Sequence, residues 1–142
     1  MNTVYQASCV AIGGRAILIE GPPGSGKSSL ALALMDRGAW LIGDDAVTLS
    51  MVGGSLCASP PPNVAGLIEV RNVGVLRRPA VSGVPVALAL RFDVEAPRFI
   101  ESADTCAVGG VMVPLVRLWP GSPVLALRAE AALELYGLPR AE

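Results

Sequence analysis

A glycine-rich stretch at residues 21–28 reads Gly-Pro-Pro-Gly-Ser-Gly-Lys-Ser and constrains the fold more than any other part of the chain. In the pattern G-x-x-x-x-G-K-S, successive backbone N–H groups form a cradle for phosphate, and the following helix adds its positive end. Residues 16–19 predict a buried strand before the stretch, and residues 27–37 predict a helix that ends at Gly38. A chance glycine-rich turn would lack these flanking elements, so we predict a phosphate-binding loop.

The loop predicts a bound nucleoside triphosphate with Mg²⁺. The ammonium group of Lys27 can reach the outer phosphates, and the hydroxyl of Ser28 is a suitable ligand for Mg²⁺. The residues expected to bind the nucleotide are Gly21, Pro22, Pro23, Gly24, Ser25, Gly26, Lys27, Ser28 and Ser29.

Composition limits the classes of protein to which the chain can belong. Its length predicts one domain over residues 1–142, and its net charge of −1 without a basic run argues against nucleic-acid binding. Hydrophobic residues make up 52% of the chain, yet charges or prolines interrupt every apolar stretch before the ~20 residues of a membrane helix. We therefore expect no membrane span, no secretory signal, and a homo-oligomer that buries the excess apolar surface.

The chain has three cysteines and no histidine. The number of cysteines is odd, and the three, Cys9, Cys57 and Cys106, are far apart in the sequence. This pattern favours buried thiols in a reducing cytoplasm over disulfides or a zinc site. The absence of histidine excludes Ser-His-Asp triads, histidine–metal sites and imidazole bases.

Hydrophobic patterning predicts a strand-rich α/β or α+β domain with two main helices around one sheet. A hairpin that turns at Gly13-Gly14 is expected to lead into the phosphate loop, and another is expected to turn at Gly53-Gly54. The other predicted elements are strands at 40–42, 67–71, 86–92 and 108–118, a short helical turn over 62–66, and a helix over 128–136.

Two adjacent carboxylates, Asp44 and Asp45, follow the apolar strand after the predicted helix. On an extended segment they point to opposite sides, so one can serve a metal ion and the other an incoming hydroxyl group. The alternative is a solvated turn in which an aspartate caps the backbone. The position directly after the phosphate-loop helix favours a functional pair.

Several segments together resemble the C-terminal catalytic domain of HPr kinase/phosphorylase. The stretch 67–76 is similar to the family signature L-L-E-I-R-G-L-G-I-I, and the resemblance runs from about residue 5 to about residue 133. It looks like a short form without the N-terminal domain of the larger members. The other matching segments are 21–28, 37–38 and 41–45.

The resemblance implies an α/β P-loop domain related to phosphoenolpyruvate carboxykinase, with a central β-sheet and few helices. It implies an ATP- and Mg²⁺-dependent kinase of the cytoplasm that phosphorylates a serine of an HPr-like phosphocarrier protein and regulates carbohydrate metabolism through the phosphotransferase system. Full-length members are hexamers. The implied roles are Lys27 as the phosphate-loop lysine, Ser28 and Glu69 as Mg²⁺ ligands, Asp45 as the proton acceptor, and Arg98 as a catalytic arginine.

The chain departs from the family pattern at three places. Gln6 stands where the family has a histidine, and Asn72 stands where the signature has a glycine. Residues 114–123 match only part of a late motif, P-x-R-P-G-R-N, that is linked to the reverse, phosphorylase reaction. An amide cannot relay a proton as imidazole does. One alternative is therefore an ATP-binding sensor or regulatory module with little catalysis; a small-molecule kinase ranks last, because the chain is too short for a lid and a substrate clamp.

Overall fold

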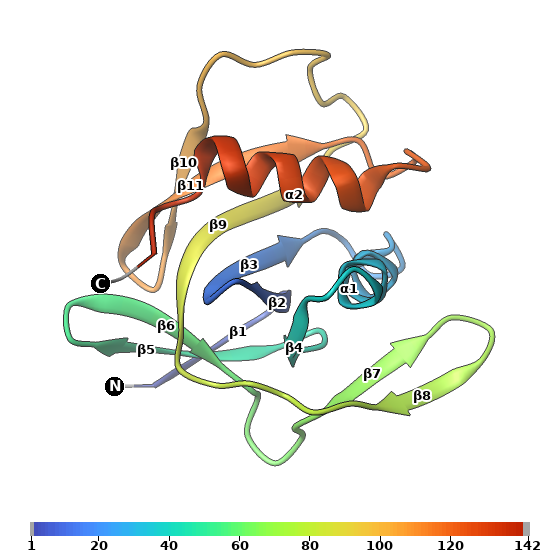
Figure 1. The fold of residues 1–142 in the computed structure, drawn as a ribbon, viewed down its shortest axis with the longest axis vertical. Helices are drawn as coiled ribbons and strands as arrows, with labels where there is room; N and C mark the ends of the chain where they lie inside the picture. The colour runs from blue at the N-terminus through green and yellow to red at the C-terminus, as the bar shows by residue number, and fades with distance from the viewer. Residues whose placement is uncertain (1, 141–142) are drawn as a thin grey trace.

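The structure is a computed structural model that describes residues 2–140. Within this range, nine strands form one curled sheet that carries two helices, and the remaining two strands form a separate hairpin (Figure 1). The elements in chain order are β1 (Thr3–Tyr5), β2 (Ser8–Ile12), β3 (Arg15–Glu20), α1 (Lys27–Asp36), β4 (Trp40–Gly43), β5 (Val47–Val52), β6 (Ser55–Ser59), β7 (Leu67–Val70), β8 (Gly74–Arg77), β9 (Val84–Phe92), β10 (Asp104–Val108), β11 (Val111–Leu118) and α2 (Leu125–Tyr136).

The central strands β2, β3 and β9 are apolar almost without interruption because both of their faces are covered. Along β3, Ile17 and Ile19 point into a core beneath the helices, whereas Ala16 and Leu18 point into a second core on the opposite face. All four of these residues are fully buried. The predicted α/β domain with few helices is confirmed.

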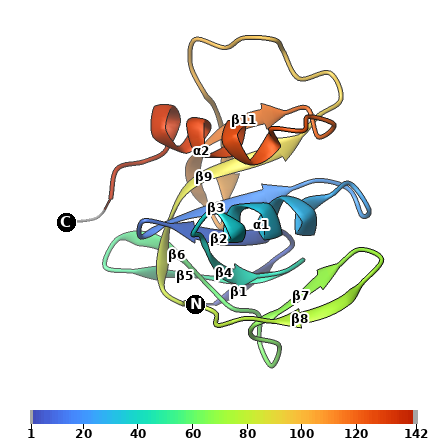
Figure 2. The same cartoon turned by 45° about the vertical axis from the view of Figure 1, so that its right-hand side comes forward.

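Both helices pack on the same face of the sheet (Figures 1 and 2). Helix α1 lies against β2, β3 and β4, and α2 lies against β9, β11 and α1. Leu30 and Leu34 of α1 and Leu133 of α2 supply much of the buried surface between the helices and the sheet. The opposite face closes on itself, since β5 and β6, which join the sheet at the start of β9, fold over β2 and β3 and enclose the second core. Val113 and Leu115 of β11 also contribute to this core.

Three predicted elements differ in the structure. The single strand predicted over 108–118 is the second half of a β10–β11 hairpin, which turns at Gly109-Gly110 with positive φ at both glycines. Residues 62–66 form a turn instead of a helical segment. The last helix begins at Leu125, three residues before the predicted start. The paired glycines are the same hairpin signal that correctly predicts turns at 13–14 and 53–54.

The sheet topology sets the place of the phosphate loop. Strands β3 and β9 run parallel, with Glu20 opposite Arg91, so their carboxyl ends meet at one edge of the sheet. The loop leaves β3 at this edge and leads directly into α1. The β7–β8 hairpin contacts α1 and stands beside the same edge (Figure 1). In residues 2–140 neither helix has the length and apolar content needed to cross a bilayer.

Burial of a cysteine thiol and a tyrosine hydroxyl makes the stability of the fold sensitive to alkaline pH. Burial raises the pKa of the fully buried Cys9 thiol, and burial together with a hydrogen bond to Glu20 raises the pKa of Tyr5. The unfolded chain releases these protons from about pH 8.5 for cysteine and about pH 10 for tyrosine, while the folded chain still holds them. The contribution of these two groups to the free energy of unfolding is therefore fully present below these pH values and is lost as the pH rises above them.

We accordingly expect the free energy of unfolding to fall above about pH 8.5, by up to about 1.4 kcal/mol per pH unit for each such proton. Cys9→Ala should flatten this decline between pH 8.5 and 10, whereas Val10→Ala, on the same buried strand, should lower stability equally at every pH. Urea unfolding under reducing conditions measures both slopes. Parallel slopes in the parent chain and Cys9→Ala would contradict the assignment.

Candidate active site

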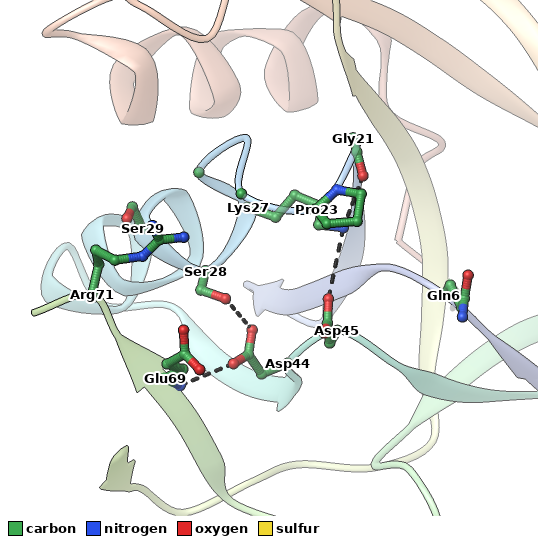
Figure 3. Close-up of a pocket in the computed structure, with 12 residues that line it drawn as sticks. Gln6, Gly21, Pro23, Lys27, Ser28, Ser29, Asp44, Asp45, Glu69 and Arg71 are labelled. Carbon is green, nitrogen blue, oxygen red and sulfur yellow. Dashed lines mark hydrogen bonds and ion pairs between the residues drawn. The ribbon is translucent and has the colours of Figure 1, made fainter. Parts of the chain in front are cut away.

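The phosphate loop forms the floor of a pocket of about 340 Å³ (Figure 3). A turn within the loop is closed by the N–H of Ser25, which donates to the carbonyl of Pro22 at 3.1 Å. Gly26 then caps α1 with φ 104°, a left-handed conformation that favours glycine, and no side chain occupies the cap. The first N–H groups of α1 are thus left for a ligand.

Lys27 folds back across the loop that precedes it. Its Nζ donates to the carbonyl of Gly21 at 2.8 Å and lies 3.7 Å from Oδ1 of Asp45. The side chain is only 13% exposed, so its charge is directed into the pocket instead of into bulk water. A bound phosphate group would meet this ammonium at the base of the cradle.

Asp44 is the hub of the polar contacts in the pocket. Its Oδ1 accepts hydrogen bonds from the hydroxyls of Ser28 at 2.5 Å and Ser8 at 3.1 Å, and its Oδ2 accepts from the backbone N–H of Glu69 at 2.9 Å. These three donors come from α1, β2 and β7, so one carboxylate joins three elements. Figure 3 shows the contacts to Ser28 and Glu69.

Asp45 lines the same pocket but has different partners. Its side chain is 82% exposed at the mouth of the pocket, near Lys27. The predicted extended segment is not observed at this pair. Asp45 adopts φ 70° in a tight bend instead of continuing an extended strand. Gly43 permits this bend, since a Cβ at that position would lie 2.3 Å from the carbonyl oxygen of Ala46.

The β7–β8 hairpin forms the remaining wall of the pocket. Glu69 and Arg71 both line it, although both side chains belong to exposed residues. The guanidinium of Arg71 faces the phosphate loop: an ideal Cβ on Gly24 would lie 4.0 Å from its Nη2. The hairpin therefore brings a carboxylate and a cation to the pocket from a segment more than 40 residues after the loop.

A second set of polar contacts, centred on Glu20, lies directly before the phosphate loop. Glu20, the last residue of β3, accepts a hydrogen bond from the hydroxyl of Tyr5 and two from Arg91, at 2.9 and 3.1 Å. The hydrogen bonds that Arg91 donates to Glu20 raise the pKa of Arg91. Burial, together with the nearby Glu20 carboxylate, raises the pKa of Cys106. These contacts fix the end of β3 immediately before Gly21.

The residues present fit a magnesium–nucleotide complex. The hydroxyl Oγ of Ser25 is buried within the loop without a partner among the described residues, so the loop retains polar capacity. Residues 2–140 contain no cluster of three or more histidine, cysteine, aspartate or glutamate side chains suited to a metal. Mg²⁺ does not need such a cluster, because it usually takes one or two protein oxygens and fills the remaining positions with water and phosphates.

Most of the predicted site residues come together. The residues of the predicted set that line the pocket are Gly21, Pro23, Gly24, Gly26, Lys27, Ser28, Ser29, Asp44, Asp45 and Glu69. Pro22 and Ser25 shape the loop without lining the pocket.

Arg98, the expected catalytic arginine, does not line this pocket. It belongs to the loop between β9 and β10 and lines a separate groove with β11 and α2. The reason is a tether within this loop: Ile100 packs into the helix-side core, and its carbonyl accepts a hydrogen bond from the hydroxyl of Tyr136 at 3.2 Å. The loop is thereby held on the α2 side of the sheet edge.

Three further residues belong to the site beside the expected binding and catalytic residues, and only Ser8 among them had no expected role. Gln6 and Arg71 line the pocket, and the buried Ser8 contacts both members of the carboxylate pair. For Arg71 the signal is its place in the family-like segment 67–76, and for Gln6 it is the position at which the family has a histidine. For Ser8, the only signal in the sequence is a hydroxyl in an otherwise apolar strand, which is too common to be decisive.

A buried strand, a glycine-rich loop, a helix and a carboxylate pair at the end of the next strand define a P-loop domain. A family model described as the HPr Serine kinase C-terminal domain matches residues 1–87. The chain belongs to this family.

Individual relatives agree with the family. The chain is 39% identical over 90 residues to HPr kinase/phosphorylase of Clostridium tetani, covering 63% of this chain and 30% of the relative. It is 31% identical over 145 residues to HPr kinase/phosphorylase of Chlorobium phaeobacteroides, covering 91% of this chain and 45% of the relative. The chain thus spans less than half the length of these two curated relatives.

A solved structure shares the fold over nearly its whole length. The Hpr(Ser) kinase/phosphatase from Coxiella burnetii superimposes with a TM-score of 0.81 at 26% identity, covering 93% of this chain and 88% of that chain. The β10–β11 hairpin and α2 lie beyond the segment that the family model matches. The superposition therefore extends the similarity into the second half of the chain.

Proposed function

We propose that this chain is an ATP- and Mg²⁺-dependent protein-serine kinase that acts on an HPr-like phosphocarrier protein. The observation that carries the proposal is the division of the carboxylate pair: Asp44 is bonded to Ser28, whereas Asp45 stands exposed beside Lys27. This arrangement supports a role for Asp44 beside a metal–phosphate complex and a role for Asp45 toward an approaching hydroxyl group. The names of the relatives supply the class of substrate.

In the proposed reaction, Asp45 accepts the proton of the substrate serine. The serine oxygen forms a bond to the γ-phosphorus of ATP as the bond from that phosphorus to the bridging oxygen breaks, which releases ADP. Lys27 and Arg71 offset the negative charge of the phosphates. When bound, Mg²⁺ would neutralise phosphate charge; Ser28 and Glu69 would hold it, and Asp44 orients the Ser28 hydroxyl.

The proposal includes the biological setting implied by the family. It places the chain in the cytoplasm, in regulation of carbohydrate metabolism through the phosphotransferase system, and as a homo-oligomer, with the hexamer as the form to test. It leaves out the reverse, phosphorylase reaction. Residues 114–123 match the corresponding motif only in part, and none of them lines the pocket.

The direct test is incubation of the chain with ATP, Mg²⁺ and the phosphocarrier proteins of its host, followed by mass spectrometry of each carrier. The proposal expects one added phosphate on a serine of one carrier, and none without Mg²⁺. Tight ATP binding with no transfer to any carrier would instead support the ATP-binding regulatory module. Transfer to a metabolite alone would support a small-molecule kinase.

Gln6 offers a test of how the proton leaves the site. It lines the pocket with Asp45 and is neutral at every working pH, so it cannot accept the proton that Asp45 takes from the substrate serine. Gln6→His adds a group that titrates near pH 6.5, and we expect transfer to rise about tenfold above that pH. The pH–rate profile measures the effect, with Gln6→Asn as the non-titrating control. An unchanged profile for Gln6→His would show that this position takes no part in proton transfer.

A further inference from the structure

Ser8, the first residue of β2, is one of two buried polar residues among those that the structure describes. It is fully inaccessible, yet its hydroxyl is used twice. It donates to Oδ1 of Asp44 at 3.1 Å and accepts from the backbone N–H of Asp45 at 3.2 Å. A hydroxyl can do both because it carries one donor and two acceptor lone pairs.

The bond to Asp45 bears on an unusual backbone conformation. Asp45 is one of three non-glycine residues in the described range with positive φ, a conformation that L-residues rarely adopt. Such a conformation persists when surrounding contacts hold it. The Ser8 hydroxyl is the acceptor for the Asp45 N–H, and it lies on a neighbouring strand that is buried on both faces. The bend that turns Asp45 toward Lys27 is therefore anchored to β2.

The bond to Asp44 acts on the other half of the pair. Ser8 of β2 and Ser28 of α1 donate to the same oxygen of Asp44. Loss of the Ser8 donor would leave Oδ1 held by Ser28 alone and Oδ2 by the Glu69 N–H, so the carboxylate would lose one of its three donors. The hydroxyl of Ser8 thus contacts the side chain of Asp44 and the backbone of Asp45 at the same time.

We propose that Ser8 is a positioning residue that holds Asp44 and Asp45 in the division of roles described above. The inference rests on the proposed kinase function and adds a determinant of its rate. A residue at position 8 without a hydroxyl would leave the Asp45 N–H without its acceptor and Asp44 without one of its donors. The expected consequence is misplacement of the proton acceptor with little change in the phosphate cradle.

The test compares Ser8→Ala with Ser8→Thr, which keeps the hydroxyl, and Ser8→Cys, which keeps the shape but bonds weakly. The matched control is Ser122→Ala, which removes the other buried hydroxyl, a group that accepts from the Val124 N–H away from the pocket. We expect kcat for transfer to the phosphocarrier to fall about 10- to 100-fold in Ser8→Ala, with KM for ATP changed less than about threefold. Ser8→Thr should recover most of kcat, and Ser122→Ala should match the parent chain.

Amide hydrogen exchange at Asp45 provides a readout that needs no substrate. Exchange should quicken at Asp45 in Ser8→Ala and Ser8→Cys and stay slow in Ser8→Thr and Ser122→Ala, at unchanged far-UV circular dichroism. If the parent chain transfers phosphate to no carrier, the proposed function fails, and the exchange data still decide the role of Ser8. Parent-like exchange and parent-like kcat in Ser8→Ala would overturn the inference. Equal loss of kcat in Ser8→Ala and Ser122→Ala would do the same.

Discussion

Asp45→Asn is expected to lower the rate of phosphate transfer by about 10²- to 10⁴-fold while ATP still binds. Asparagine has nearly the shape of aspartate but does not accept the hydroxyl proton. Asp45 is exposed at the mouth of the pocket, so its replacement should leave the fold and the phosphate loop intact. Loss of its negative charge 3.7 Å from Lys27 frees that ammonium for phosphate, so ATP affinity should stay equal or rise slightly.

Single-turnover transfer with labelled ATP measures the rate, and calorimetric titration measures the affinity. Asp36→Asn is the matched control, since Asp36 is an exposed aspartate at the end of α1, outside the pocket. That variant should transfer at the parent rate. Parent-like transfer by Asp45→Asn would remove Asp45 from the mechanism, whereas lost ATP binding in this variant would give Asp45 a role in the nucleotide site itself.

Lys27→Ala is expected to weaken ATP binding by about 10- to 100-fold, the worth of one charge-assisted hydrogen bond to phosphate. The ammonium is largely buried and directed into the loop, so water does not replace it easily. Lys27→Arg should restore binding only in part, because a guanidinium is a planar fork and not a compact point charge. Calorimetric titration with ATP and Mg²⁺ compares the three chains.

The sequence offers a second measurement of the same site. Lys27 is the only lysine in the chain, so an amine-directed reagent has this side chain and the N-terminal amine as its targets. ATP with Mg²⁺ should protect Lys27 from modification and leave the N-terminal amine reactive, which serves as the internal control. Unchanged affinity in Lys27→Ala, together with no protection by ATP, would place the nucleotide elsewhere.

Features that depend on neighbours in the chain were predictable. The phosphate loop needs eight consecutive residues, a strand before them and a helix after them, and all of this is present in one local stretch. The turns at 13–14 and 53–54 follow from paired glycines for the same reason. Where the prediction was wrong, as at 104–118, the local signal was present at Gly109-Gly110 but a longer apolar run obscured it.

Features that depend on distant contacts were not predictable from the pattern of residues. Ser8 meets Asp44 across 36 positions of sequence, and the N–H of Glu69 meets the same carboxylate across 25. Both contacts require the pairing of β2 with β4 and the placement of the β7–β8 hairpin, which arise from long-range packing and not from local periodicity. The exclusion of Arg98 from the pocket likewise comes from a tertiary tether, the bond from Tyr136 to Ile100.

The local sequence therefore specifies a phosphate-binding loop, because its backbone geometry needs only consecutive residues. The difference in contacts and exposure between Asp44 and Asp45 arises only when the chain is folded. Their side chains are identical, and a bend at Asp45, a buried hydroxyl from β2 and a backbone N–H from β7 give them different surroundings. Contacts among segments far apart in the chain thus give two identical side chains different hydrogen-bond partners and different exposure.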